Sequence, residues 1–78
     1  MKITVRYFAG LREQKGQDSE ELSVPSGSTA EDVVQSLVPE GPNGRLPVMV
    51  AVNCAYVSRE HLLQEGDEVA LIPPLGGG

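Results

Sequence analysis

Residues 28–38 form the one segment of this sequence with the spacing of an amphipathic helix long enough to cover a sheet. Its apolar residues recur at intervals of three and four: Ala30, Val33, Val34, Leu37 and Val38. Ser28 followed by Glu31 matches a capping box and predicts the helix start, and Pro39 predicts its end. One helix covers only one face of a sheet, so we expect an α+β domain whose mixed sheet packs on one main helix and leaves its other face partly open.

Five segments have the alternation or apolar run of a β-strand: residues 2–8, 20–24, 48–52, 55–57 and 68–72. In the first segment the residues at positions 3, 5 and 7 share one face. If the first and last strands are neighbours, Val69 and Leu71 point with them toward the helix. Phe8 and Ile72 then point away from the helix, which predicts two exposed apolar side chains near the end of the chain.

The segments between the strands carry turn and short-helix signals. Residues 9–15 are rich in helix formers, and Gly16 follows as a left-handed cap, so a short helix is expected there. Asn53 and Cys54 predict the turn of a hairpin. Residues 58–63 predict a further helical turn, whereas the glycines and prolines of residues 40–47 predict a loop.

Composition excludes several classes of function. Six Lys and Arg against eleven Asp and Glu give a formal net charge of -5, the wrong sign for a nucleic-acid partner. The sequence contains no apolar stretch near the ~20 residues of a membrane span, so no membrane partner is expected. A lone cysteine predicts a reducing, cytoplasmic setting, and one His with one Cys supplies no metal-ligand set.

Two reactive side chains invite a functional interpretation. Cys54 has no His paired with it at a predicted hairpin turn, which favours a structural or incidental thiol over a sulfur donor. His61 lies beside Glu60 in a charged turn and is interpreted as a solvated surface residue rather than a general base.

The most informative motif is the run of glycines at residues 76–78. No residue follows Gly78 to begin the helix that a phosphate-binding glycine loop requires. Glycines without Cβ atoms can instead thread a narrow channel and present a terminal carboxylate to another protein. Pro73 and Pro74 stiffen the base of this arm, whose fully extended reach is about 20 Å.

A terminal carboxylate is a poor acyl electrophile and requires activation, for example by adenylation. The sequence has no nucleotide-binding motif, so a separate enzyme has to supply that step. We therefore expect a folded domain over residues 1–74 and a flexible tail over residues 75–78, acting as a carrier or co-substrate. An inert glycine tail is the alternative.

Three runs of residues carry a family resemblance: YFAGLRE at 7–13, VN with YVS within 52–58, and GDEVALIPPLGGG at 66–78. Through them nearly the whole chain resembles the MoaD/ThiS ubiquitin-like family, and within it the small sulfur-carrier subunits of molybdopterin synthase. The most specific parts are the GDEVA strand entry, the paired prolines and the final two glycines. The resemblance implies a β-grasp (ubiquitin-like) fold.

The resemblance also implies a role for the last residues. Gly78, with Gly77 beside it, would be adenylated by a MoeB-type adenylyltransferase that uses ATP and then converted to a thiocarboxylate. Inserted into the large, MoaE-type subunit of a heterotetramer, it would donate sulfur to cyclic pyranopterin monophosphate and so form the molybdopterin dithiolene. The chain itself would bind no cofactor and have no activity alone.

The residues implied to contact the partner subunit are apolar or belong to the tail: Phe8, Tyr56, Ile72, Pro73, Pro74, Leu75 and Gly76. Gly76 departs from the family, which more often has Ser or Thr at that position. The paired prolines favour molybdopterin over thiamin among the pathways that the family serves. Two alternatives stay open beside the inert tail: sulfur delivery to the thiazole of thiamin, and a ubiquitin-like modifier joined to target lysines through Gly78.

Overall fold

The computed structural model describes residues 1–74, which form one five-stranded sheet, one two-stranded sheet and two helices. In chain order the elements are β1 (Lys2–Tyr7), α1 (Ala9–Lys15), β2 (Ser19–Ser23), α2 (Ala30–Leu37), β3 (Glu40–Gly41), β4 (Gly44–Arg45), β5 (Met49–Val52), β6 (Ala55–Val57) and β7 (Glu68–Ile72). The larger sheet has the strand order β2-β1-β7-β5-β6. Within residues 1–74 no helix has the length and apolar character needed to span a bilayer. The α+β prediction is confirmed.

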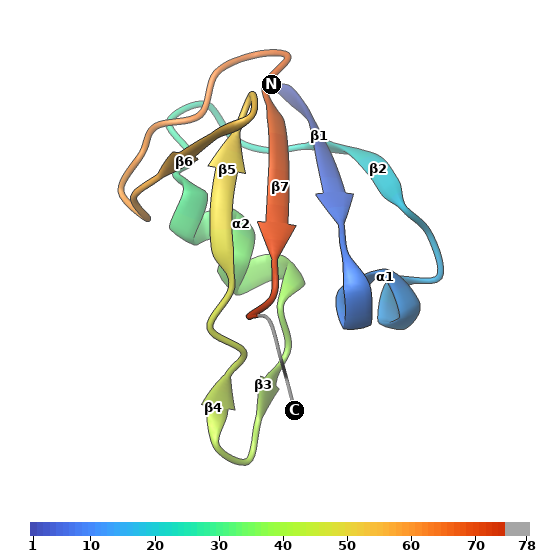
Figure 1. The fold of residues 1–78 in the computed structure, drawn as a ribbon. Coiled ribbons are helices and arrows are strands. Elements are labelled where there is room, and N and C mark those ends of the chain that lie inside the picture. The colour runs from blue at the N-terminus through green and yellow to red at the C-terminus, as the bar shows by residue number, and fades with distance from the viewer. Residues whose placement is uncertain (75–78) are drawn as a thin grey trace.

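The first and last strands lie side by side in the interior of the sheet. β1 and β7 run parallel, with Val5 opposite Val69 and Tyr7 opposite Leu71, and all four side chains are buried. α2 crosses behind the sheet (Figure 1) and adds Ala30, Val33 and Val34 to the same core. The predicted facing of these residues is therefore confirmed, and only the α2 side of the sheet is covered by the main helix.

α2 begins one residue later than its capping pattern predicted. The N-cap is Thr29, whose hydroxyl accepts a hydrogen bond from the Asp32 N–H at 3.3 Å, while Asp32 Oδ2 accepts from the Thr29 N–H at 2.9 Å. The predicted box of Ser28 and Glu31 is wrong because the buried Ser28 hydroxyl donates to the Pro25 carbonyl at 2.7 Å. Both pairs have the three-residue spacing of a capping box, so spacing alone did not separate them.

The predicted helical turn over residues 58–63 is present only as a single turn, in which the His61 N–H donates to the Ser58 carbonyl at 3.2 Å, and it does not continue to Leu63. Its carbonyls accept hydrogen bonds from the start of α2: Ala30 N–H donates to His61 and Glu31 N–H donates to Arg59. The first N–H groups of a helix have no acceptor within the helix, and the carbonyls of this loop serve as their acceptors. The carbonyls of Arg59 and His61 bond to α2, and the segment does not continue as a helix beyond that turn.

The Arg59 side chain clamps this loop to α2 and to the entry of β5. Its Nη1 donates to Glu31 Oε1 at 2.6 Å, and its Nη2 donates to the Val48 carbonyl at 2.8 Å. Hydrogen bonds from Gln35 and then Arg59 lower the pKa of the Glu31 carboxyl below its usual value of 4.5. Glu31 therefore stabilises the folded state in its charged form.

Replacing this carboxylate gives a pH-dependent stability prediction. A carboxyl whose pKa is lowered by folding contributes stability above its unfolded pKa and loses that contribution as the pH falls through its folded pKa. We expect Glu31→Gln to lower the free energy of unfolding at pH 7, and the difference from the parent protein to shrink toward pH 3. Urea denaturation at both pH values measures it, with the exposed Glu60→Gln as the control. An equal loss at both pH values would contradict the assignment.

Residues 40–47, predicted as a loop, contain the small β3–β4 hairpin. Glu40 pairs with Arg45 and Gly41 with Gly44 across a Pro-Asn turn, and Gly44 has a left-handed φ of 94°. The Arg45 Nε also donates to the Val38 carbonyl at 2.8 Å, which ties the hairpin to the residue after α2. The sequence pattern missed it because each strand has only two residues.

Candidate functional site

The sheet face opposite α2 carries a shallow groove, which we call the open-face groove. Phe8, Ala51, Tyr56, Ala70 and Ile72 supply its apolar lining, and Arg6, Cys54 and Glu68 complete it. These residues come from four strands, the residue after β1 and the turn between β5 and β6. Strand alternation explains the grouping of the strand residues, because each of them is one position away from a side chain that faces α2.

The open face carries three of the five large exposed apolar side chains of residues 1–74, and two of them line the groove. Tyr56 is 66 % exposed and Phe8 is 38 % exposed, and Met49, 53 % exposed, lies opposite Ile72 on the same face. Isolated exposed apolar residues are normal on small proteins, whereas a contiguous group of them marks an interaction surface. The face is therefore suited to contact another protein.

A charged rim borders the apolar part of the groove. Arg6 lies 3.7 Å from the Glu68 carboxylate, and its guanidinium carbon is 5.9 Å from the centre of the Phe8 ring. Because both charged side chains are about half exposed, the ion pair contributes little to stability. The rim can help to orient a partner while the apolar residues supply contact area.

β7 carries the chain from this face to the end of the sheet where the β3–β4 hairpin projects (Figure 1). Ile72 is its last residue and is half-buried on the open face, followed by the half-buried Pro73 and the exposed Pro74. Proline has no N–H to donate, so pairing ends there. The predicted tail residues Leu75, Gly76, Gly77 and Gly78 lie outside the described residues.

The structure thus brings the predicted contact residues Phe8, Tyr56 and Ile72 into one groove and places Pro73 and Pro74 directly after it. That these residues bind a partner stays a prediction. Sequence reasoning missed Met49 and Ala51, because residues 48–52 are too uniformly apolar to show which side chains face outward. The antiparallel register of β5 with β7 identifies them: Met49 lies opposite Ile72 and Ala51 opposite Ala70.

Cys54 occupies the predicted hairpin turn between β5 and β6. Asn53 has a φ of 50° and Cys54 a φ of 73°, the left-handed values of a type I′ turn. The thiol is exposed at the rim of the groove, and His61 is an exposed loop residue elsewhere. Turn geometry explains the position of Cys54 without any reaction of its sulfur.

The backbone of Cys54 gives a second stability prediction. A left-handed conformation costs a residue with a side chain about 1–2 kcal/mol, and glycine avoids this cost. Glycine also loses more conformational entropy on folding, which offsets about 0.5–1 kcal/mol of the gain. Cys54→Gly should therefore gain about 0.5–1 kcal/mol and raise the melting temperature by about 4 °C. Calorimetry tests this, with Cys54→Ala as the matched control that removes the thiol but keeps the strain. Equal melting temperatures for the two variants would contradict it.

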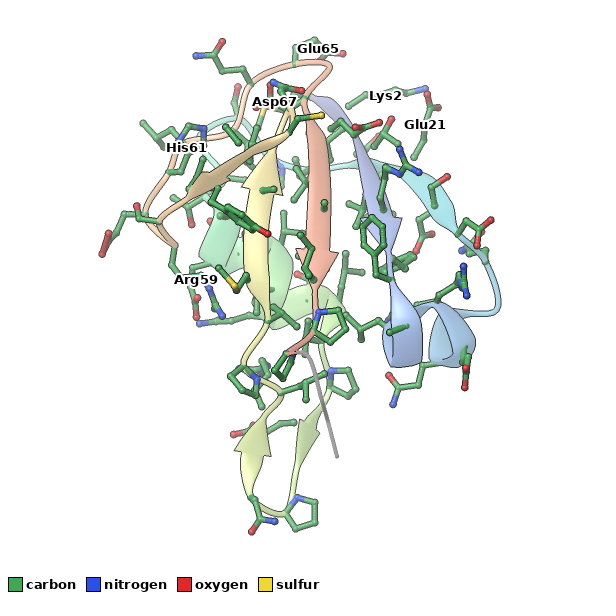
Figure 2. The ribbon with its side chains drawn as sticks, in the orientation of Figure 1. Lys2, Glu21, Arg59, His61, Glu65 and Asp67 are labelled. Atoms are coloured by element: carbon green, nitrogen blue, oxygen red, sulfur yellow. The ribbon has the colours of Figure 1, made fainter. Side chains whose placement is uncertain are left out.

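The carboxylates of the acidic turn before β7 accept hydrogen bonds that hold the turn in place. Asp67 Oδ2 accepts from the Gln64 N–H at 2.8 Å, Asp67 Oδ1 accepts from the Asn53 amide at 3.0 Å, and Glu65 Oε1 accepts from the Lys2 N–H at 3.0 Å. Figure 2 places Glu65 and Asp67 at the end of the sheet opposite the exit of β7. These carboxylates stabilise the turn and lie far from the C-terminal end of β7.

Comparison with known proteins identifies what this arrangement is similar to. The ThiS family matches residues 5–78. The molybdopterin synthase sulfur carrier subunit of Arabidopsis thaliana is 37 % identical, over 100 % of this chain and 84 % of that protein. Small archaeal modifier protein 3 of Haloferax volcanii is 38 % identical over the full length of both chains.

The crystal structure of SAMP1 from Haloferax volcanii superposes with a TM-score of 0.81 at 27 % identity, covering 100 % of both chains. The expected β-grasp, ubiquitin-like fold is thereby confirmed. A fold match over whole chains and a family match over nearly the whole sequence agree with each other. This chain therefore belongs to the ThiS family of ubiquitin-like proteins.

Proposed function

We propose that this chain is the sulfur-carrier subunit of a molybdopterin synthase. The observation that carries the proposal is that the apolar open-face groove includes Ile72, and that the sequence continues from Ile72 through Pro73 and Pro74 into the glycine motif. A surface for a partner adjoins a segment able to enter that partner. The relative from Arabidopsis thaliana bears this function in its name and matches the whole chain.

The proposed chemistry takes place at the carboxylate of Gly78. A carboxylate oxygen attacks the α-phosphorus of ATP, pyrophosphate leaves, and an acyl adenylate forms. Hydrosulfide then attacks the acyl carbon, AMP leaves with the bonding electrons, and loss of the remaining proton gives the thiocarboxylate. A MoeB-type adenylyltransferase supplies the ATP site in this proposal, since the chain has no nucleotide-binding motif.

The large, MoaE-type subunit is the proposed acceptor. Phe8, Tyr56 and Ile72 supply apolar contacts to it, and Leu75 and Gly76 lead Gly77 and Gly78 into its active site. Glycine at the last positions lets backbone pass where a Cβ atom would collide. The sulfur then joins cyclic pyranopterin monophosphate on the way to the dithiolene. The lone thiol of Cys54 supports a reducing, cytoplasmic setting for these steps.

Reconstitution tests the assignment. The thiocarboxylated protein, mixed with a MoaE-type large subunit and cyclic pyranopterin monophosphate, should yield molybdopterin and return to the carboxylate form. The same protein supplied to thiazole-forming enzymes of thiamin synthesis should transfer little sulfur. The opposite preference would assign the carrier to thiamin and overturn the proposal.

The relative named small archaeal modifier protein 3 favours a second candidate, a protein modifier. In that case the activated Gly78 would form an isopeptide bond with lysines of other proteins. Immunoblots of cells expressing the tagged chain would then show heavier conjugates that disappear when Gly78 is deleted. Conjugates without molybdopterin formation would favour this candidate over the first.

A further inference from the structure

The strand β2 forms a free edge of the larger sheet. Val24 N–H donates to the Met1 carbonyl at 2.8 Å, and Tyr7 N–H donates to the Asp18 carbonyl at 2.8 Å. Donors and acceptors alternate along an antiparallel pair, so the even-numbered residues from 18 to 24 bond toward β1. The N–H and C=O groups of Ser19, Glu21 and Ser23 therefore point outward, and within residues 1–74 no further strand pairs with them.

An apolar groove runs beside this edge on the α2 side of the sheet. Leu22 and Val24 from the β2 segment and Leu37 from α2 line it, each only partly buried, together with Asp32. A strand added to the β2 edge would place every second side chain over these residues, because side chains alternate across a sheet. Edge and groove together, which we call the β2 edge site, match an extended peptide with aliphatic residues at alternate positions.

The charged residues near the β2 edge indicate which residues suit the peptide positions between the aliphatic ones. Glu21 is exposed on the opposite face of β2, Asp32 stands at the groove, and no Lys or Arg belongs to the groove lining among residues 1–74. Figure 2 shows Lys2 on the neighbouring strand β1, and Arg6 of β1 lies on the same face, where it is 3.7 Å from Glu68. A basic side chain placed opposite Glu21, between two aliphatic positions, would therefore meet that carboxylate, whereas Asp32 lies on the α2 side with the aliphatic side chains.

The same charges disfavour a second copy of this chain as the occupant. Antiparallel pairing of two β2 edges in full overlap sets Glu21 opposite Glu21, with Ser19 opposite Ser23. Like charges placed directly opposite each other destabilise a strand pair. Edge charges of this kind protect sheets from self-pairing while leaving the edge available to a complementary strand.

We propose that the β2 edge site binds an extended segment of a partner protein in which aliphatic and basic residues alternate. The segment extends the sheet by one strand, its backbone pairs with Ser19, Glu21 and Ser23, and its aliphatic side chains cover Leu22, Val24 and Leu37. The site lies at the opposite edge of the sheet from β6 and does not use Gly78. It is independent of the sulfur-carrier proposal.

The test uses the full chain and the peptide Lys-Val-Lys-Val-Lys-Leu-Lys, labelled at its N-terminus with fluorescein. Fluorescence anisotropy measures affinity, and amide hydrogen exchange follows individual residues by NMR. On binding, the outward amides of Glu21 and Ser23 should slow their exchange about ten-fold, while those of Glu20 and Leu22, already in the ladder, change little. The peptide Lys-Lys-Val-Val-Leu-Lys-Lys has the same composition without the alternation and should bind weakly.

Ser23→Pro removes one outward N–H and blocks the edge, a position at which a sheet tolerates proline. It should weaken binding about ten-fold or more through the lost hydrogen bond and the ring, whereas Ser23→Ala, which keeps the N–H, should bind like the parent. Unchanged exchange of the inward amides checks that each variant is folded. Equal binding by Ser23→Pro and Ser23→Ala, equal binding of both peptides, or absence of binding would each overturn the proposal.

Discussion

Deletion of Gly78 is expected to reduce thiocarboxylate formation by at least about 100-fold. The variant still ends in a glycine carboxylate, that of Gly77, so the reacting group is present and only its position changes. The shortened tail places it about 3.4 Å nearer the domain. A misplacement of 1 Å already costs about 100-fold in well-oriented reactions.

Mass spectrometry after incubation with ATP, sulfide and the activating enzyme measures this effect. Gly76→Ser is the matched control, because it changes the same segment without altering its length and should retain most of the conversion. The folded domain should melt at the same temperature in all three proteins. Efficient conversion of the shortened chain would show that tail length does not position the carboxylate.

Phe8→Asp is expected to weaken binding to the large subunit by about 100-fold without unfolding the domain. Aromatic residues at the centre of an interface commonly contribute 2 kcal/mol or more, and each 1.4 kcal/mol is about ten-fold in affinity. Phe8 is also the N-cap of α1 and makes no side-chain capping hydrogen bond. Aspartate is a preferred N-cap residue, so the substitution should stabilise α1. Phe8 does not belong to the buried core, so its removal should cost little packing energy there.

Leu62→Asp is the matched control for this binding experiment. Leu62 is 60 % exposed and bridges to Thr29 at the start of α2, so it lies away from the open-face groove. The variant introduces the same charge in place of another exposed apolar side chain and should bind normally. If both variants bound equally, the open-face groove would not be the interface. Isothermal titration calorimetry provides both affinities.

Local signals predicted both helices and the longer strands well, and the two-residue strands and the connections poorly. The helix from Ala9 to Lys15 and its left-handed Gly16 cap follow from composition and one glycine, and β7 follows from alternation between a turn and two prolines. The start of α2 did not follow, because the Ser28 hydroxyl is taken by the Pro25 carbonyl in the folded chain. Similarly, the loop at residues 58–63 takes its shape from bonds to α2, a partner distant in the sequence.

The candidate site shows the same division. Parity along β1 and β7 predicted that Phe8 and Ile72 share the face away from α2, and the groove confirms it. Met49 and Ala51 join that face only through their register with β7, which a uniformly apolar run does not encode locally. The β2 edge site likewise depends on which strands are neighbours, and so appears only in the folded sheet.

The most direct test of the sulfur-carrier account is the intact mass of the protein after incubation with ATP, a sulfide source and a MoeB-type activating enzyme. The account predicts a mass gain equal to the replacement of one oxygen by sulfur, located at Gly78 by fragmentation. An unchanged mass, with the same enzyme shown to be active on its own carrier, would contradict it.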